Sequence, residues 1–358
     1  MSNNELNNNL LESLSGGKNL LIYDDDGKES VMVCIPKFKI SDVIDGGCDE
    51  VHPAFIINGE EKECIYVSKY QNIVENEKAY SLPFKDPAVL YSFNEVKEFC
   101  ENKGKKWHLM TNAEWAAVAL WSKKNKSLPR GNNNNGSEYS MPHERGVLIS
   151  LNAITPEGEQ GPPMRVATGS GPVSWSHNGS ESGIYDLNGN VWEFVSGVRI
   201  IDSAINIIKD NNAAICDISE YSKQWRGISE KGNLTNIDDK QCVGYKSSHI
   251  DENGIADTIL SFDTSSCDAD ASTFMSKFST IQKKSEITNT SLLESLCLYP
   301  DAHNDAKEVL WGVSKGMKLP IRGGYWVNGE MAGVFSCGFY MDTDSKYFDV
   351  GFRACYYD

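Results

Sequence analysis

The segment GIYDLNGNVWEF, residues 183–194, restricts the fold of this chain more than any other feature of its sequence. Its Asn-Gly pair supplies the positive φ angle that a tight turn needs, and the residues after the turn can leave as a strand. On that strand Trp192 and Phe194 share one face and Glu193 points to the other. A simple core hairpin explains the turn and the aromatic residues, but it leaves the glutamate unexplained.

Two capping boxes predict the helices of the chain. Ser92 and Glu95 open one helix, which Gly104 closes, and Thr111 and Glu114 open the next. Short apolar or alternating runs on either side predict strands. The sequence therefore predicts a mixed protein with two helices among short strands.

We interpret residues 21–358 as one domain that follows a leader. The leader, residues 1–20, is rich in asparagine and is predicted to be a flexible tail or an attachment segment. At about 200–309 the chain becomes polar and rich in serine and aspartate. We interpret this stretch as an elaborated insertion in the same domain, with two separate domains as the alternative.

Charge and composition exclude several classes of protein. A formal net charge of −16 repels phosphate backbones, so we expect no nucleic-acid partner. The N-terminus has no signal-peptide pattern and no window is apolar enough for a membrane helix, so we expect cytoplasmic synthesis without membrane insertion. The ten cysteines form no C-x-x-C pair, which favours free thiols.

Residues 183–194 resemble the signature G-[LI]-x-D-[LM]-x-G-N-V-W-E-[WF] of the formylglycine-generating-enzyme and sulfatase-modifying-factor family. WHLMTNAEW, residues 107–115, resembles the family's R-L-P-T-E-A-E-W helix start, and the final RGG…GFR resembles its ending. The matches cover roughly residues 31–199 and 309–358. The resemblance implies an α+β, C-type lectin-like fold of the formylglycine-generating-enzyme subtype, with two helices around short antiparallel sheets and much irregular structure.

Catalysis is not expected, although the family contains enzymes. Copper-dependent members use two cysteines five apart, shortly after the terminal R-G-G, and this chain has Asn328 and Gly333 there. Cys337 and Cys355 are expected on different strands and make a poor copper pair. Iron-dependent relatives use a histidine-rich site, and the sequence has no such cluster.

The C-terminal stretch from residue 321 resembles the variable region of diversity-generating retroelement target proteins, such as phage tropism determinants. In that branch a reverse transcriptase rewrites selected codons at adenines, and the residues around those codons stay fixed. The resemblance places a ligand-binding region at about 322–354. With Trp192 from the signature segment, the residues that we call the frame are Trp192, Gly323, Gly324, Trp326, Phe335, Gly351, Phe352 and Arg353.

The other residues of this stretch include both rigid aromatic rings and charged side chains, a combination that is not typical of a buried core face. Aromatic side chains give large contact areas at low entropic cost, so binding surfaces favour them. An ordinary polar loop at the end of the chain is the alternative. The residues that we call the variable positions are Tyr325, Val327, Asn328, Glu330, Met331, Ser336, Gly338, Tyr340, Asp342, Asp344, Lys346, Tyr347 and Asp349.

Catalytic relatives bind calcium near the signature segment. The resemblance therefore implies that Asn188, Gly189, Val191 and Glu193 could hold a structural calcium ion through oxygen atoms. A buried Glu193 hydrogen-bonded to backbone N–H groups is the alternative. We expect no other cofactor.

The sequence thus predicts a non-enzymatic receptor-binding or ligand-binding protein with a diversified C-terminal surface. Its ligand would be a cell-surface protein or glycan. The protein itself would be located on a virion tail or on a cell surface. Homo-oligomer formation or particle assembly would raise its avidity. The alternatives are a family-type metal-dependent oxidase and a fixed structural particle protein.

Overall fold

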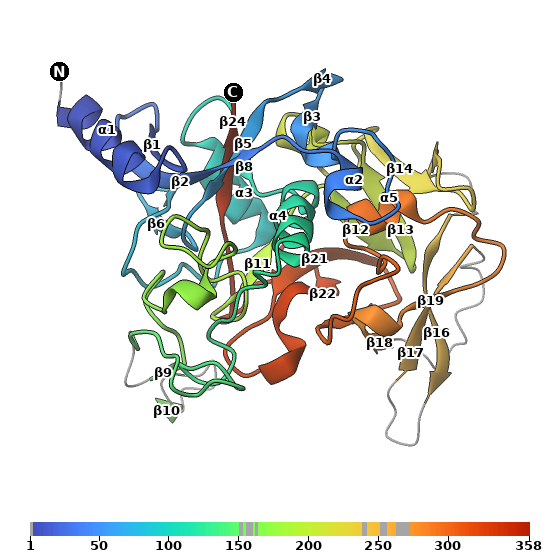
Figure 1. Ribbon diagram of the computed structural model, residues 1–358. Coiled ribbons are helices and arrows are strands. Elements are labelled where there is room, and N and C mark those ends of the chain that lie inside the picture. The colour runs from blue at the N-terminus through green and yellow to red at the C-terminus, as the bar shows by residue number, and fades with distance from the viewer. Residues whose placement is uncertain are drawn as a thin grey trace.

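The computed structural model describes residues 3–149, 153–154, 160–161, 164–237, 242–250, 256–262 and 273–358. The fold is α+β, as predicted (Figure 1). None of the helices in this described part of the chain is long and apolar enough to cross a membrane. The helices are α1 (Asn3–Ser15), α2 (Ile40–Val43), α3 (Phe93–Glu101), α4 (Asn112–Lys124) and α5 (Ser291–Ser295).

Both predicted capping boxes are present, and they begin α3 and α4. The Ser92 hydroxyl accepts from the Glu95 N–H while the Glu95 carboxylate accepts from the Ser92 N–H, and Thr111 and Glu114 repeat this exchange. α3 buries one face, whereas α4 is buried nearly all round and lies in the centre of the molecule (Figure 1).

The smaller sheet joins the beginning and the end of the chain. The C-terminal strand β24 lies between β5 and β8, antiparallel to both. The order of the sheet is β1 (Asn19–Tyr23), β2 (Glu29–Pro36), β5 (Cys64–Ser68), β24 (Ala354–Tyr357) and β8 (Trp107–Leu109).

The larger sheet contains the C-terminal variable stretch and strands of the insertion. Its main path is β18 (Thr273–Lys277), β20 (Val309–Val313), β22 (Gly333–Met341), β21 (Met317–Gly323), β12 (Val198–Ile201), β13 (Ala204–Ile208), β16 (Gly244–Ile250), β17 (Ala256–Ser261) and β19 (Gln282–Lys283). Off this path lie β11 (Trp192–Phe194), β23 (Val350–Phe352), β14 (Trp225–Ile228) and β15 (Leu234–Thr235). The insertion therefore extends the sheet that holds β21 and β22.

Three short hairpins complete the strands. They are β3 (Ile56–Ile57) with β4 (Glu60–Glu61), β6 (Ile73–Glu75) with β7 (Lys78–Tyr80), and β9 (Ala153–Ile154) with β10 (Gln160–Gly161). Short 3-10 turns also occur, one of them at Gly329–Met331.

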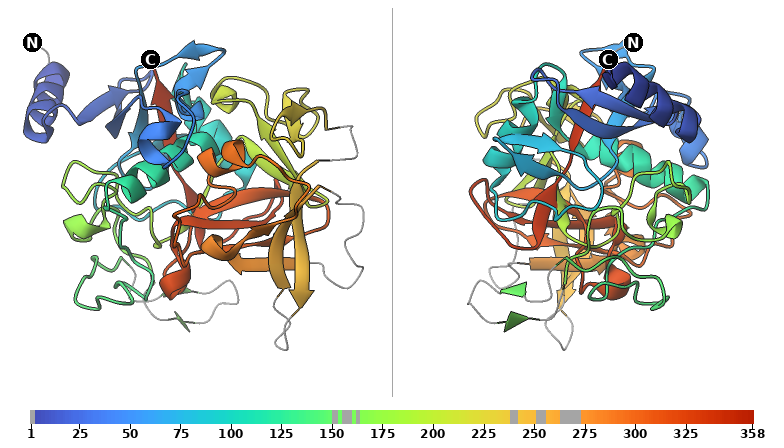
Figure 2. Two further views of the ribbon diagram at one scale, coloured as in Figure 1. Left: turned by 45° about the vertical axis from the view of Figure 1, so that its right-hand side comes forward. Right: turned by 90° about the vertical axis from the view of Figure 1, so that its left-hand side faces the viewer.

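The leader was predicted to be a flexible tail or an attachment segment; the structure shows a helix in it, and the role in attachment stays a prediction. The leader forms α1, which lies at one end of the molecule (Figure 2) and continues into β1. The Asn8 side-chain oxygen accepts from the Leu21 N–H at 2.8 Å, so the asparagines of this segment can hold backbone groups. Composition alone suggested a mobile tail because it does not reveal such contacts.

Thr111 does more than cap α4, since its hydroxyl also donates to the Asn211 side-chain oxygen at 2.6 Å. Thr111→Ala should therefore lower the free energy of unfolding by about 1 to 2 kcal/mol, and Ser92→Ala by about 1 kcal/mol or less. Urea unfolding followed by circular dichroism measures both. An equal or greater cost for Ser92→Ala would show that the contact with Asn211 adds nothing.

Candidate ligand-binding site

The signature strand β11 lies between the two ends of the C-terminal variable stretch. It pairs antiparallel with β21, where Glu193 faces Arg322, and parallel with β23, where Glu193 faces Gly351. The Trp192 N–H also donates to the Asp349 carbonyl at 2.8 Å. Both ends of the stretch are thus hydrogen-bonded to one short strand.

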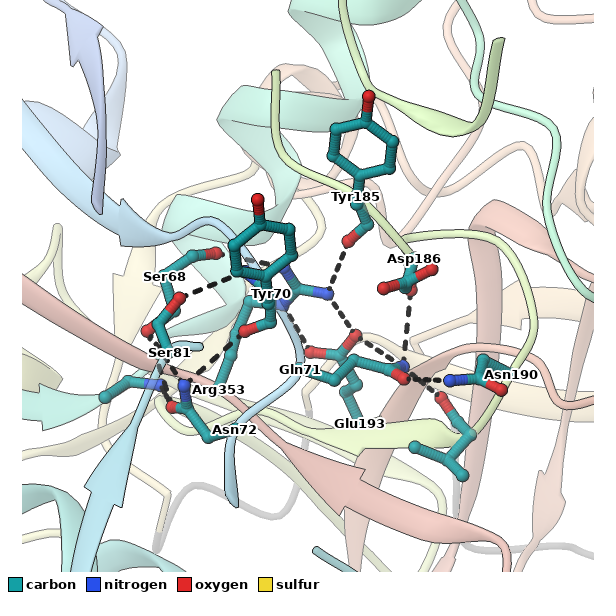
Figure 3. Close-up of polar contacts among 12 residues, drawn as sticks. Ser68, Tyr70, Gln71, Asn72, Ser81, Tyr185, Asp186, Asn190, Glu193 and Arg353 are labelled. Atoms are coloured by element: carbon teal, nitrogen blue, oxygen red, sulfur yellow. Dashed lines mark hydrogen bonds and ion pairs between the residues drawn. The ribbon is translucent and has the colours of Figure 1, made fainter. Parts of the chain in front are cut away.

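A buried ion pair joins β11 to the end of the stretch (Figure 3). Arg353 donates through Nε and through one terminal nitrogen to the two oxygens of Glu193, both at 2.6 Å. The same guanidinium donates to the carbonyls of Ser68 and Tyr185, each at 3.0 Å, and Gln71 donates to Glu193 at 3.1 Å. A bidentate pair with its remaining donors satisfied is the arrangement in which a buried charge is tolerated.

These contacts do not fit the calcium site that the resemblance implied. Both oxygens of Glu193 accept from Arg353, and the Val191 carbonyl accepts from Gln71 at 2.9 Å. The Asn188 side-chain oxygen accepts from the Asn133 amide at 3.2 Å. A cation would have to displace these donors. The alternative, a buried glutamate paired within the fold, describes the contacts, although its donors are side chains and not backbone N–H groups.

All eight residues of the frame are buried. Trp192 and Phe352 pack in one hydrophobic cluster with Val350, while Phe335 belongs to a second cluster with residues of α4. Gly324 has φ +83°, and a Cβ there would lie 2.6 Å from the Ala332 Cβ. The frame therefore consists of side chains and turns that the core needs.

Two of the variable positions, Ser336 and Gly338, are not accessible to a ligand in this structure. Both are buried within β22, and the Ser336 hydroxyl donates to the Val309 carbonyl. A Cβ on Gly338 would lie 2.8 Å from Trp311 Nε1. The reason is β20, which pairs in parallel with β22 and brings Trp311 opposite Gly338. For these two residues the prediction of ligand contact is wrong.

All of the other variable positions are at least partly exposed. Val327 is 47% exposed and Met331 37%, and Glu330 beside them is within 4.0 Å of Lys277 and Lys307. Asn328, by contrast, uses its side-chain oxygen to accept from the Tyr325 N–H at 2.9 Å.

The loop at 342–349 rests on other parts of the chain through polar contacts. Lys346 pairs with Glu95 at 2.7 Å and Asp342 with Lys318 at 2.6 Å. Asp344 accepts weakly from Asn94, at 3.5 Å. Glu95 is thus both the capping residue of α3 and an anchor of this loop.

A group of aromatic side chains lies beside this loop, and we call it, together with Asp349, the tyrosine patch. Tyr340 stacks on Trp311 with 4.2 Å between ring centroids, and Tyr347 meets Tyr340 at 6.0 Å. Tyr347 is 41% exposed, whereas Tyr325 and Tyr340 are half-buried. Burial is the main cause that raises the pKa of both half-buried tyrosines, and the nearby Asp349 carboxylate adds to it. The patch is Tyr325, Tyr340, Tyr347, Trp311 and Asp349.

Asp349 is unusual among the acidic residues of this stretch. Its Oδ1 is buried and has no hydrogen-bond partner among the described residues. Burial raises the pKa of its carboxyl to about 6, and its own backbone N–H opposes only part of that rise. A buried carboxylate oxygen without a donor costs free energy unless a partner from outside supplies one.

Sequence reasoning placed four members of the patch among the variable positions but missed Trp311. It also missed Glu95 and Lys318, which anchor the loop, and Arg165, which donates to the Phe348 carbonyl at 3.2 Å. These residues lie in other segments, and no local pattern marks them as neighbours of the loop. Only the pairing of β20 with β22 brings Trp311 to the patch.

Within the part of the chain that the structure describes, one group of residues has the composition of a metal site. His108, Glu114 and Cys355 are buried with ligand atoms within 4.8 Å of one another. The Glu114 carboxylate, however, already accepts from the Thr111 N–H and the Asn211 amide, and it contacts His108 Nε2 at 2.9 Å. Burial and the adjacent Glu114 raise the pKa of Cys355, so its thiol stays protonated. These residues form a hydrogen-bond network that needs no ion.

Residues 52–203 match the family described as the sulfatase-modifying factor enzyme 1-like domain. This range includes the signature segment and the start of α4, so the match confirms the resemblance found in the sequence. With it, the formylglycine-generating-enzyme type of C-type lectin-like fold is confirmed. The match ends before the C-terminal stretch and does not cover the variable positions.

Two solved structures resemble the chain at low identity. The structure of PvdO from Pseudomonas aeruginosa is 14% identical with a TM-score of 0.38, covering 95% of this chain and 98% of its own. Treponema denticola variable protein 1 is 10% identical with a TM-score of 0.33, covering 95% and 99%. No curated protein matches the chain significantly. At these TM-scores neither structure carries an argument about the site.

The ion pair between Glu193 and Arg353 yields a stability prediction. Arg353→Met leaves a buried carboxylate without its two closest donors, so the free energy of unfolding should fall by about 3 to 5 kcal/mol. Adding Glu193→Leu removes that charge and should recover part of the loss. Chemical denaturation of the single and double variants measures both effects. A double variant as unstable as the sum of the two single variants would contradict the pairing.

Asp349 yields a pH-dependent prediction, in which the substitution stabilises the protein. Its folded pKa of about 6 lies above the unfolded value of about 3.9. The free energy of unfolding therefore falls as the pH rises from about 3.9 to about 6, and it stays lower above that range. Asp349→Asn should therefore raise the free energy of unfolding by about 1 to 2 kcal/mol at pH 7 and change little at pH 3.5. Denaturation at both pH values tests this. The exposed Asp344→Asn is the control and should stay within about 0.5 kcal/mol at either pH.

Proposed function

We propose that this chain is a non-enzymatic ligand-binding protein that presents its C-terminal stretch as a diversified binding surface. The observation that carries the proposal is that β11 pairs with both ends of this stretch and leaves the middle outside the core. Its two ends pair with β11 and contribute the buried frame, while Tyr347, Val327 and Met331 between them are exposed. Such a stretch can change its exposed side chains without changing the pairing that holds it.

The composition of the exposed surface supports binding. Tyrosine and tryptophan combine a large apolar face with a polar group and few rotatable bonds, as in paratopes. The tyrosine patch presents such rings beside a loop that is held by ion pairs at Glu95 and Lys318. Little ordering entropy would therefore oppose binding.

The arrangement of the cysteines supports a role without catalysis. The positions where copper-dependent relatives have their cysteine pair hold Asn328 and Gly333. Cys337 and Cys355 are buried on β22 and β24, and burial raises the pKa of the Cys337 thiol to about 11. A protonated, enclosed thiol is a poor nucleophile and a poor copper ligand.

We further propose a virion tail, or alternatively a cell surface, as the place where the protein acts. The ligand would be a protein or glycan on a cell, and several copies on one particle would compensate for a weak single site. The acidic charge of −16 is compatible with a displayed soluble surface.

The diversification itself predicts a pattern of codon changes. Deep sequencing of codons 322–358 in a population grown from one clone should find substitutions at the exposed variable positions, traceable to adenines in a nearby template copy. The frame codons should stay constant because their side chains form the core. A uniform sequence without a template copy would remove diversification and leave a fixed binding module.

The tyrosine patch predicts a separation of binding from folding. The double variant Tyr340→Ala, Tyr347→Ala should lose adsorption of the purified protein to target cells by tenfold or more, because aromatic anchors dominate such interfaces. Its thermal unfolding should remain cooperative. Phe84→Ala removes an aromatic side chain that is 65% exposed outside the patch, and should bind like the unaltered protein. Unchanged adsorption of the double variant would refute the proposed surface.

A further inference from the structure

Some acidic residues around the tyrosine patch have a cationic partner and others do not. Asp342 pairs with Lys318 and Glu95 pairs with Lys346. Asp349 is the most enclosed of the three, yet within the residues that the structure describes it takes part in no ion pair, and its Oδ1 accepts no hydrogen bond. The exposed Asp344 of the same loop also has no ion pair among the described residues, but water can solvate it. Asp349 is therefore the enclosed carboxylate without a counter-charge.

Among the described residues, the basic side chains of this loop and its neighbours already have acidic partners. Lys318 and Lys346 are engaged as described. Arg165 reaches the neighbouring Phe348 carbonyl, but its guanidinium forms a bidentate pair with Asp86 at 2.9 and 3.0 Å. A partner for Asp349 would have to come from another molecule.

The aromatic rings around Asp349 also favour a positively charged partner. Tyr325 and Tyr340 pack against the hydrophobic cluster that contains Val350, the neighbour of Asp349, and the ring of Tyr340 meets that of Tyr347 at 6.0 Å. Burial raises the pKa of both phenols, and the Asp349 carboxylate adds to the rise. Trp311 stacks on Tyr340 and adds a further aromatic face. The faces of aromatic rings attract cations, most strongly when water is partly excluded. A carboxylate beside several such rings favours an organic cation over a neutral or anionic group.

We propose that Asp349, together with Tyr325 and Tyr340, binds an organic cation, an alkylammonium or guanidinium group of the ligand. The inference rests on the proposed function, because it names the chemistry that the patch recognises. Such a group could be a lysine or arginine side chain of a protein or a quaternary amine such as choline. Asp349 and both tyrosines are variable positions, so this preference belongs to the present sequence of the patch.

The test uses small probes and does not need the natural ligand. Isothermal titration of the full chain at pH 7.5 compares N-acetyl-lysinamide, N-acetyl-argininamide and choline with the neutral N-acetyl-norleucinamide. At least one cation should bind about tenfold or more tightly than norleucinamide. Preference for the amino-acid probes would indicate a protein source, and preference for choline a quaternary-amine source. Either result supports binding of an organic cation at the patch.

Asp349→Asn keeps the shape of the side chain and removes its charge, so it should abolish the difference between charged and neutral probes. Asp342→Asn, at an exposed acid of the same loop that is paired with Lys318, is the control and should preserve it. Equal binding of norleucinamide and all cations, or an unchanged preference in Asp349→Asn, would overturn the inference.

The same variants distinguish failure of this inference from failure of the proposed function. If Tyr340→Ala, Tyr347→Ala loses cell adsorption while Asp349→Asn and millimolar cation probes leave it intact, the binding surface stands and the cation preference is wrong. If the tyrosine variant adsorbs normally, the proposed function itself is wrong.

Discussion

The ion pair between Glu193 and Arg353 is the interaction on which the rest of the site depends. Glu193 is on the strand between the two ends of the variable stretch, and Arg353 directly follows β23. Their bidentate contact is buried, so neither residue can lose its partner without leaving an unpaired charge in the core. The signature segment and the C-terminus are thereby constrained together, although about 160 residues separate them.

This constraint explains how a stretch without regular patterning can end the chain of a folded protein. Strand pairing and the buried frame provide the stability at each end, so the residues between them need not contribute to the core. Some of them even oppose folding, as Asp349 does through its buried, unpaired oxygen. A binding site that stores unsatisfied polar groups for its ligand commonly carries such a cost.

Much of this architecture could be predicted from the sequence because its signals are local. The capping boxes at Ser92 and Thr111 depend on residues three apart, and both helices begin where they were expected. The family resemblance depends on a contiguous segment and was confirmed over residues 52–203. The burial of Trp192, Trp326 and Phe352 follows from their size and apolar character.

The rest depends on contacts between distant segments, which a single sequence does not reveal. The burial of Ser336 and Gly338 results from β20, and Trp311 reaches the patch through the same pairing. The partner of Glu193 could not be identified either, because a glutamate in a strand fits a calcium ligand as well as an ion pair. Similarly, the asparagine-rich leader gave no indication of the contact between Asn8 and Leu21.

The most direct test of this account is a saturation-mutagenesis scan of residues 322–358, displayed on cells and sorted for protease resistance. We predict that Val327, Met331, Tyr347 and the rest of the exposed variable positions tolerate most substitutions, whereas the frame residues from Gly323 to Arg353, Ser336 and Gly338 tolerate few. Equal tolerance at Ser336, Gly338 and the frame would contradict the claim that a fixed, buried frame supports a replaceable surface.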